Sequence, residues 1–178
     1  MPQTVYAREK GNVRKVNEFD RYGRLEKLRT MRAAYTHAFS ETPEEDAWRK
    51  MEAWAKPKGL LEEGVRTRVF GRNTYPTDNP EPHGYEFFLT VGTDIEPEDD
   101  IKIKEIPGGL YAVLRFKDLS NIRKAWEHLW KWIKESEYEH IGWRKGEHGW
   151  CNGFEEHLNL LEASPNQWIF DLWVQLKE

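Results

Sequence analysis

The sequence predicts an α+β fold made of two copies of one β-α-β-β module, with antiparallel sheets, two main helices and a pseudo-two-fold relation between the copies. A helical segment occurs twice, as residues 47–56 (AWRKMEAWAK) and residues 125–134 (AWEHLWKWIK). Each copy has Ala-Trp, a large apolar residue three positions after that Trp, and a second Trp three further on. A strand segment also occurs twice, as residues 85–91 (YEFFLTV) and 170–176 (FDLWVQL), which match in chemical type at every position. A module of about 75 to 85 residues needs a partner to bury its apolar face, so we expect one shared core.

Both helical segments place their apolar residues on one face. In the second copy Ala125, Leu129 and Trp132 follow the spacing i, i+4 and i+7, with charged residues opposite. The helix tryptophans lie on this apolar stripe, and we expect them to pack in the core rather than to contact a ligand. They are Trp48, Trp54, Trp126 and Trp132.

The first helix has a clear start and end in the sequence. Thr42 is a favourable cap, Pro43 suits the first helical position, and Glu45 completes a capping box. Pro57 ends the pattern. We therefore predict one helix over residues 43–56 and a second from residue 121 to about residue 135.

Alternating segments predict the strands. They cover residues 28–39, 65–70, 85–91, 101–106, 110–116, 154–158 and 167–176. The glycine pair at 108–109 predicts a bulge or turn between two of them. Residues 1–26 are expected to form a polar N-terminal arm, and the duplicated domain is expected over residues 27–178, with modules at 27–93 and 101–178.

The composition excludes several classes of function. Charged residues make up 33% of the 178 residues and the net charge is −4, which does not favour binding to nucleic acid or to an anionic membrane. The single cysteine, Cys151, forms no internal disulfide, and no apolar run is long enough to cross a membrane. The six histidines lack the spacing of metal ligands. We expect a reduced, cytoplasmic protein without metal or cofactor.

The repeated strands have two different faces. One face is apolar and suits the side under the helices; it carries Phe87, Leu89 and Val91 in the first copy and Leu172, Val174 and Leu176 in the second. The other face mixes rings and acids: Glu86, Phe88 and Thr90, and Asp171, Trp173 and Gln175. If these mixed faces meet, they line a groove that suits flat apolar cations. The alternative is a solvated outer face with incidental aromatic residues.

Four segments in this order resemble the GyrI-like family. They are residues 103–113 (IKEIPGGLYAV), the Ala-Trp-x-x-Leu-x-x-Trp helix, residues 154–159 (FEEHLN) and residues 170–174 (FDLWV). Members of this family are the effector-binding domains of multidrug-responsive transcription regulators of the AraC and MerR types, and also occur alone. The resemblance covers about residues 28–178 and implies two SHS2-like modules with a hydrophobic pocket at their seam. It implies a stand-alone protein whose partner is a lipophilic, often cationic, aromatic small molecule. Gln175 stands where the family usually has Pro, which puts little in doubt.

The resemblance places the acid at the pocket floor on Glu155. A carboxylate enclosed by aromatic residues is desolvated, so its pKa should rise and it should favour cations. Two alternatives stay open: Glu155 is a surface acid paired with a basic residue, or Glu156 faces inward because the register differs by one. The remaining expected ligand contacts are Tyr111, Phe88, Glu86, Trp173, Asp171 and Trp150. Trp150 lies in a glycine-rich segment that is equally well placed for the pocket or for the surface.

Three functions follow from these observations. The first is a non-catalytic protein that binds lipophilic aromatic cations. The second, which the resemblance implies, is a hydrolase of cyclopropane-containing aromatic drugs, with Glu155 as general acid and Asp171 or Glu86 activating water. The third is a protein-interaction module, such as a gyrase inhibitor, whose aromatic face is covered by a protein partner.

Overall fold

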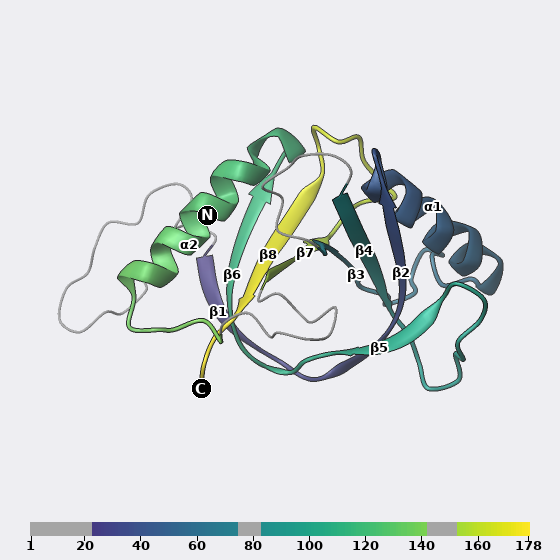
Figure 1. The fold of residues 1–178 in the computed structure, drawn as a ribbon, viewed down its shortest axis with the longest axis horizontal. Helices are drawn as coiled ribbons and strands as arrows, with labels where there is room; N and C mark the ends of the chain where they lie inside the picture. Colours follow the sequence, from purple (N-terminus) through teal and green to yellow (C-terminus); the bar gives the residue numbers. More distant parts are fainter. Residues whose placement is uncertain (1–22, 75–82, 142–152) are drawn as a thin grey trace.

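Two helices lie on one side of a single antiparallel sheet, as the repeated sequence predicts (Figure 1). The computed structural model describes residues 23–74, 83–141 and 153–178. The strands are β1 (Gly23–Leu28), β2 (Met31–Ser40), β3 (Val69–Asn73), β4 (His83–Thr90), β5 (Lys102–Ile106), β6 (Gly109–Lys117), β7 (Gly153–His157) and β8 (Ile169–Gln175). The helices are α1 (Pro43–Ala55) and α2 (Ile122–Glu135), with short 3-10 turns at Lys56–Lys58 and Leu119–Asn121. No helix in these described parts of the chain is long and apolar enough to span a membrane.

Each helix buries small and aliphatic residues one turn apart. In α1 these are Ala47, Met51 and Ala55, and in α2 they are Ala125, Leu129 and Ile133. The four tryptophans expected in the core, Trp48, Trp54, Trp126 and Trp132, flank these rows and are only partly buried. The predicted capping box at Thr42 is wrong, because the Thr42 side chain makes no cap hydrogen bond. Ser40 takes its place: its hydroxyl accepts from the Thr42 N–H and donates to Asp46.

The first strand of each module pairs with the other module. β1 pairs with β6, and β5 pairs with β2, so each module contributes an outer strand to its partner's half. The register continues from one pair to the next, from Leu28 opposite Gly109 to Met31 opposite Ile106. β1 and β2 therefore form one bent segment, β5 and β6 form another, and the two run side by side. The strand predicted at 28–39 corresponds to β2, and β1 is an additional strand at Gly23–Leu28.

The bend at residues 107–109 allows the two segments to touch. Gly108 donates its N–H to the Thr30 hydroxyl at 3.2 Å, and a Cβ at this position would lie 2.7 Å from the Thr30 nitrogen. Gly109 has a φ of +133°, a backbone conformation that residues with a side chain rarely adopt. The glycine pair predicted as a bulge therefore forms the close crossing at which the sheet curls back on itself (Figure 1).

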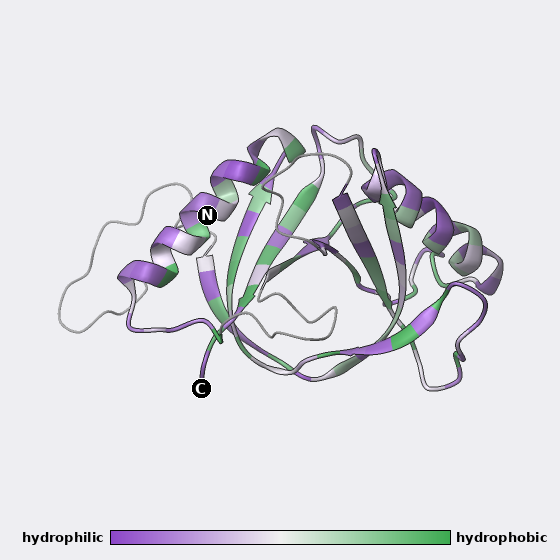
Figure 2. Cartoon of the chain, viewed as in Figure 1, coloured by the Kyte–Doolittle hydropathy of each residue, from purple (hydrophilic) through white to green (hydrophobic). Residues whose placement is uncertain are grey.

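The modules meet at the centre of the sheet. The strand order is β1-β6-β8-β7-β3-β4-β2-β5, so β3 of the first module and β7 of the second are neighbours. Hydrophobic and hydrophilic residues alternate along the strands in Figure 2. The apolar face predicted to lie under the helices is confirmed: Phe87 and Leu89 pack with α1, while Leu172 and Val174 pack with α2.

Candidate functional site

Glu155 and Glu156 are consecutive residues of β7 that point to opposite faces of the sheet. Glu155 lies opposite Gly71 of β3 and Leu172 of β8, on the side that carries the helices. Glu156 lies opposite Phe70 and Asp171, on the inner side of the curled sheet. The side chain that shares a face with the predicted ring-and-acid residues is therefore that of Glu156.

The inner side is a filled aromatic core. Phe88, Tyr111 and Trp173 lie there as predicted, together with Phe70 and Phe154, and none of the five is more than 1% exposed. Phe154 stacks on Trp173 with ring centroids 6.1 Å apart and meets Phe70 edge-on at 5.2 Å. The Tyr111 hydroxyl donates to the Pro107 carbonyl at 2.7 Å. The rings expected to line a groove thus pack against one another.

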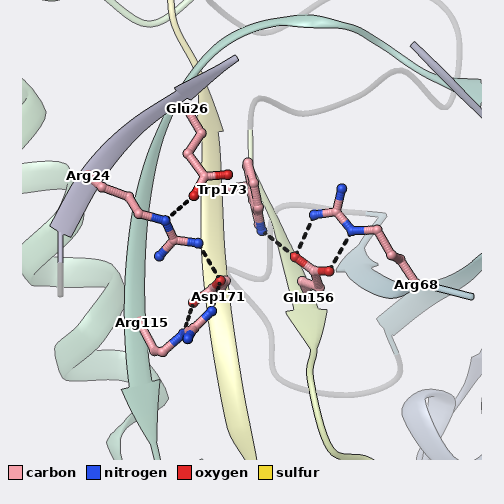
Figure 3. A network of polar contacts seen from close by, with 7 residues as sticks. All are labelled: Arg24, Glu26, Arg68, Arg115, Glu156, Asp171 and Trp173. Carbon is pink, nitrogen blue, oxygen red and sulfur yellow. Dashed lines mark hydrogen bonds and ion pairs between the residues drawn. The ribbon is translucent and has the colours of Figure 1, made fainter. Parts of the chain in front are cut away.

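Arginine side chains pair with the two inner acids of the second module, Asp171 and Glu156 (Figure 3). Asp171 accepts hydrogen bonds from Arg115 at 2.8 Å and from Arg24 at 2.7 Å, and Arg24 also contacts Glu26. Burial acts to raise the pKa of Asp171, but the hydrogen bonds from Arg115 and Arg24 outweigh it and the pKa is lowered. Asp171 is therefore an ionised acid with its cations in place.

The other two inner acids are paired in the same way. Glu156 accepts from the Nε and Nη2 atoms of Arg68 at 2.7 and 2.8 Å, and from the Trp173 indole N–H at 3.1 Å (Figure 3). Glu86 meets Arg72 at 2.6 Å and Lys104 at 3.5 Å. Each of these carboxylates already has a basic partner, so a cationic ligand on this side gains less from charge pairing.

Glu155 has a different environment. Its carboxylate is 7% exposed and accepts one hydrogen bond from the Tyr85 hydroxyl at 2.8 Å and one from the Trp126 indole N–H at 3.1 Å. Within residues 23–74, 83–141 and 153–178 it makes no ion pair. Burial raises the pKa of Glu155, the two hydrogen bonds offset part of that rise, and the negative charge of Glu44 adds to it. Burial and the Glu155 charge also raise the pKa of Tyr85 well above its usual value.

Two glycines on the central strands make room for these donors. A Cβ on Gly71 would overlap the Tyr85 hydroxyl, and a Cβ on Gly153 would lie 2.9 Å from the Trp126 ring. Tyr85 comes from the first module, while Trp126 and Glu155 come from the second. The carboxylate therefore lies at the seam between the modules, held by one aromatic donor from each.

Further rings extend from this carboxylate over both modules. On the α1 side Phe87 contacts Tyr85 at 5.1 Å and Trp48 at 5.2 Å between ring centroids. On the α2 side Trp126 stacks on Trp130 at 6.4 Å. Among the described residues this acid has no basic partner, and its neighbouring rings come from β4 and α2. In such an environment an organic cation gains both charge pairing and ring contacts.

The structure therefore divides the predicted site residues into two groups. Phe88, Tyr111, Trp173, Glu86 and Asp171 come together on the inner side, whereas Glu155 lies on the helix side and does not share a groove with them. Trp150 and Cys151 lie outside the described residues. In the described parts of the chain no group of three or more acidic, histidine or cysteine side chains is placed to hold a metal.

Sequence reasoning missed the two donors to Glu155. Tyr85, Phe87 and Leu89 are alternate residues of one strand, so their side chains point to the same face. This alternation places Tyr85 on the helix side of β4. The position of Trp126 on the helical stripe predicts a core residue. Its indole N–H donates a hydrogen bond to the buried carboxylate of Glu155.

Two modules that exchange an outer strand form one curled sheet, with an acid and aromatic donors at the seam. Residues 24–177 match the family described as the GyrI-like small molecule binding domain, and the chain belongs to this family. No curated protein matches the sequence.

Solved structures share the fold at low sequence identity. The C-terminal domain of EcmrR, a regulator of the MerR type, has a TM-score of 0.64 and 13% identity, covering 88% of this chain and 97% of that domain. EcmrR in a complex with DNA gives 0.66 and 12%, and the match spans 57% of the EcmrR chain. A hydrolase from Listeria innocua gives 0.63 and 8%, covering 88% of this chain and 92% of that one.

Proposed function

We propose that this chain binds lipophilic aromatic cations on the helix side of β3 and β7, with Glu155 meeting the positive charge. One observation carries the proposal: Glu155 is a buried carboxylate with two neutral hydrogen-bond donors and no cation among the described residues. The inner acids Asp171, Glu86 and Glu156 are also buried, but each already contacts basic side chains.

The energetic argument follows from this difference. A buried carboxylate without a counter-charge is costly, and the raised pKa of Glu155 means that a proton partly relieves that cost. An organic cation relieves it as well, and its flat rings contact Trp126 and Phe87 at the same time. A neutral ligand of the same shape gains only the ring contacts, so the site discriminates by charge.

The proposal gives the inner residues a structural role. Phe88, Tyr111 and Trp173 fill the interior of the curled sheet, and a ligand placed there would have to open a packed core. Trp150, which lies outside the described residues, stays a prediction as a wall of the ligand site.

Binding of tetraphenylphosphonium, measured by quenching of tryptophan fluorescence and by calorimetry, tests the proposal. Glu155→Gln should weaken binding by about 5- to 30-fold, because it removes a charge contact of about 1–2 kcal/mol. Tetraphenylborate has the same shape and the opposite charge, and it should bind the wild-type chain poorly and the Gln variant better.

Glu156→Gln is the matched control, since it changes the adjacent acid on the other face of the same strand. Its thermal unfolding should show a folded protein, and its affinity for tetraphenylphosphonium should stay within about twofold of wild type. If Glu156→Gln weakens binding and Glu155→Gln does not, the ligand charge lies on the inner side and the proposal is wrong.

A second function, opening of a cyclopropane ring in an aromatic compound by addition of water, is favoured by the raised pKa of Glu155 beside the Tyr85 hydroxyl. Such an acid holds its proton closer to neutral pH and can act as a general acid. Glu155 would protonate the atom that leaves as the ring bond breaks. It would then take back the proton that the attacking water releases. Asp171 and Glu86, expected to activate water, lie on the other face of the sheet.

Mass spectrometry separates turnover from binding. A gain of one water in an incubated cyclopropane-bearing aromatic compound, absent with Glu155→Gln, supports the enzyme. Saturable binding with the compound unchanged over many hours leaves a binding protein.

A further inference from the structure

Buried polar atoms without a hydrogen-bond partner concentrate on the face that carries Glu155. Among the described residues, four buried side-chain nitrogens have no such partner, and three of them belong to His83 and His157. His83 still pairs its other nitrogen with Glu44 at 3.0 Å, whereas both ring nitrogens of His157 are unpaired. Buried imidazole nitrogens normally have partners, so His157 needs a physical explanation.

His157 lies close to Glu155 and at the same seam. It follows Glu155 by two residues on β7, so both side chains point to the helix side, about 6 to 7 Å apart along the strand. Its ring meets Phe87 of the first module at 5.1 Å and Phe170 of the second at 4.9 Å. Phe87 also contacts Tyr85, so one ring connects His157 to the donor that holds Glu155.

The imidazole is neutral and unsatisfied in this position. Burial lowers the pKa of His157 to about 3, so the ring carries one N–H donor and one acceptor nitrogen at neutral pH. Each buried group left without a partner is destabilising, and a phenylalanine would fill the same space between Phe87 and Phe170 without that cost. A group that supplies the missing hydrogen bond recovers the loss when it binds.

We propose that His157 is a specificity-determining residue that hydrogen-bonds an uncharged polar group of the ligand. The ligand class is an aromatic cation with a hydroxyl, carbonyl or ring nitrogen about 6 to 7 Å from its positive charge, matching the spacing from Glu155 to His157. This inference rests on the proposed function, because it uses Glu155 as the site of the charge.

A matched pair of probes tests it. Tetraphenylphosphonium has no hydrogen-bonding group, and (4-hydroxyphenyl)triphenylphosphonium adds one hydroxyl across one ring from the charge. Wild type should bind the hydroxyl compound about 3- to 10-fold more tightly. His157→Phe should lose the preference and bind the two compounds with equal affinity. His157→Gln, which keeps a donor and an acceptor, should retain part of the preference.

Thermal unfolding without ligand provides a second measurement. His157→Phe should raise Tm by about 2–6 °C, because two unpaired nitrogens are replaced by carbon. A lower Tm in this variant would mean that the nitrogens are satisfied within the fold, and would overturn the proposal. So would equal affinities in wild type, or a preference that survives in His157→Phe. Failure of wild type to bind either phosphonium overturns the proposed function as well, whereas binding without hydroxyl preference overturns only the role of His157.

Discussion

The two consecutive glutamates of β7 show how partners, rather than burial, decide what a buried acid can do. Glu155 is 7% exposed and Glu156 is 5% exposed. Glu156 is held by a two-point contact with Arg68 and by Trp173, while Glu155 is held by the neutral donors Tyr85 and Trp126. The first arrangement completes a charge pair, and the second leaves a negative charge without a partner in the described chain.

The same difference separates the two faces of the sheet. On the inner side, the acids Asp171, Glu156 and Glu86 pair with five basic side chains around an aromatic core, and Figure 3 shows the pairs of the first two. On the helix side, the described part of the chain supplies no cation to Glu155 and no hydrogen-bond partner to the nitrogens of His157. Such incomplete satisfaction is costly for folding, and it is where a ligand has most to gain.

Removing the partner of Glu156 should produce the largest effect. Arg68→Met removes the guanidinium that lies over the Phe70 and Trp173 rings and leaves Glu156 buried and uncompensated. We expect a loss of about 2–4 kcal/mol in the free energy of unfolding by urea denaturation. Adding Glu156→Gln to this variant should restore more than half of the loss. A loss below about 0.5 kcal/mol would mean that Glu156 is solvated, and the contrast with Glu155 would disappear.

Filling the space under Tyr85 should have an intermediate effect. Gly71→Ala places a methyl group where the Tyr85 hydroxyl lies, so the ring must move away from Glu155. We expect a loss of about 1–3 kcal/mol by urea denaturation. Tyr85→Phe is the comparison, since it removes the hydrogen bond without crowding. If both variants cost the same, the hydrogen bond accounts for the effect and the close fit at Gly71 does not.

The fold could be predicted from the sequence because its signals are local and repeated. Two segments have a 3.6-residue period and form helices α1 and α2; they are residues 47–56 and 125–134. Two others have a two-residue period and form strands β4 and β8; they are residues 85–91 and 170–176. The exchange of β1 and β5 between the modules could not be read in this way. Strand pairing depends on which edges meet in space, and the alternation in residues 23–28 and 102–106 suits either partner.

The run Phe154-Glu155-Glu156-His157 explains why the sequence alone leaves the placement of the two acids open. Phe154 and Glu156 point to one face of the strand, and Glu155 and His157 point to the other. Each face therefore has one acid and one ring, and alternation alone does not show which acid shares a face with Trp173. The expected groove on the inner side also depends on how far the sheet curls, which the exchanged strands determine. In the curled sheet, large side chains such as those of Phe70 and Trp173 pack together in the interior.

A pH series on Glu155→Gln tests the smallest expected difference. The pKa of Glu155 is raised in the folded state, so the folded chain holds a proton that the unfolded chain releases. The stability that depends on protonated Glu155 should therefore be fully present below the unfolded pKa of 4.5. It should fall as pH rises through the folded pKa. In Glu155→Gln this fall should be absent, so the stability of the variant relative to wild type should increase as pH rises above the unfolded pKa.

Asp171→Asn should show the opposite sign, because the pKa of Asp171 is lowered by Arg115 and Arg24 against the effect of burial. The stability that ionised Asp171 contributes is present above its unfolded pKa of about 3.9 and is lost as pH falls through the folded pKa. Urea denaturation of wild type and both variants from pH 3 to pH 8 measures the two trends together. Parallel curves for wild type and Glu155→Gln over the whole range would show that Glu155 ionises without penalty. The acid would then have no unmet charge with which to select a cation.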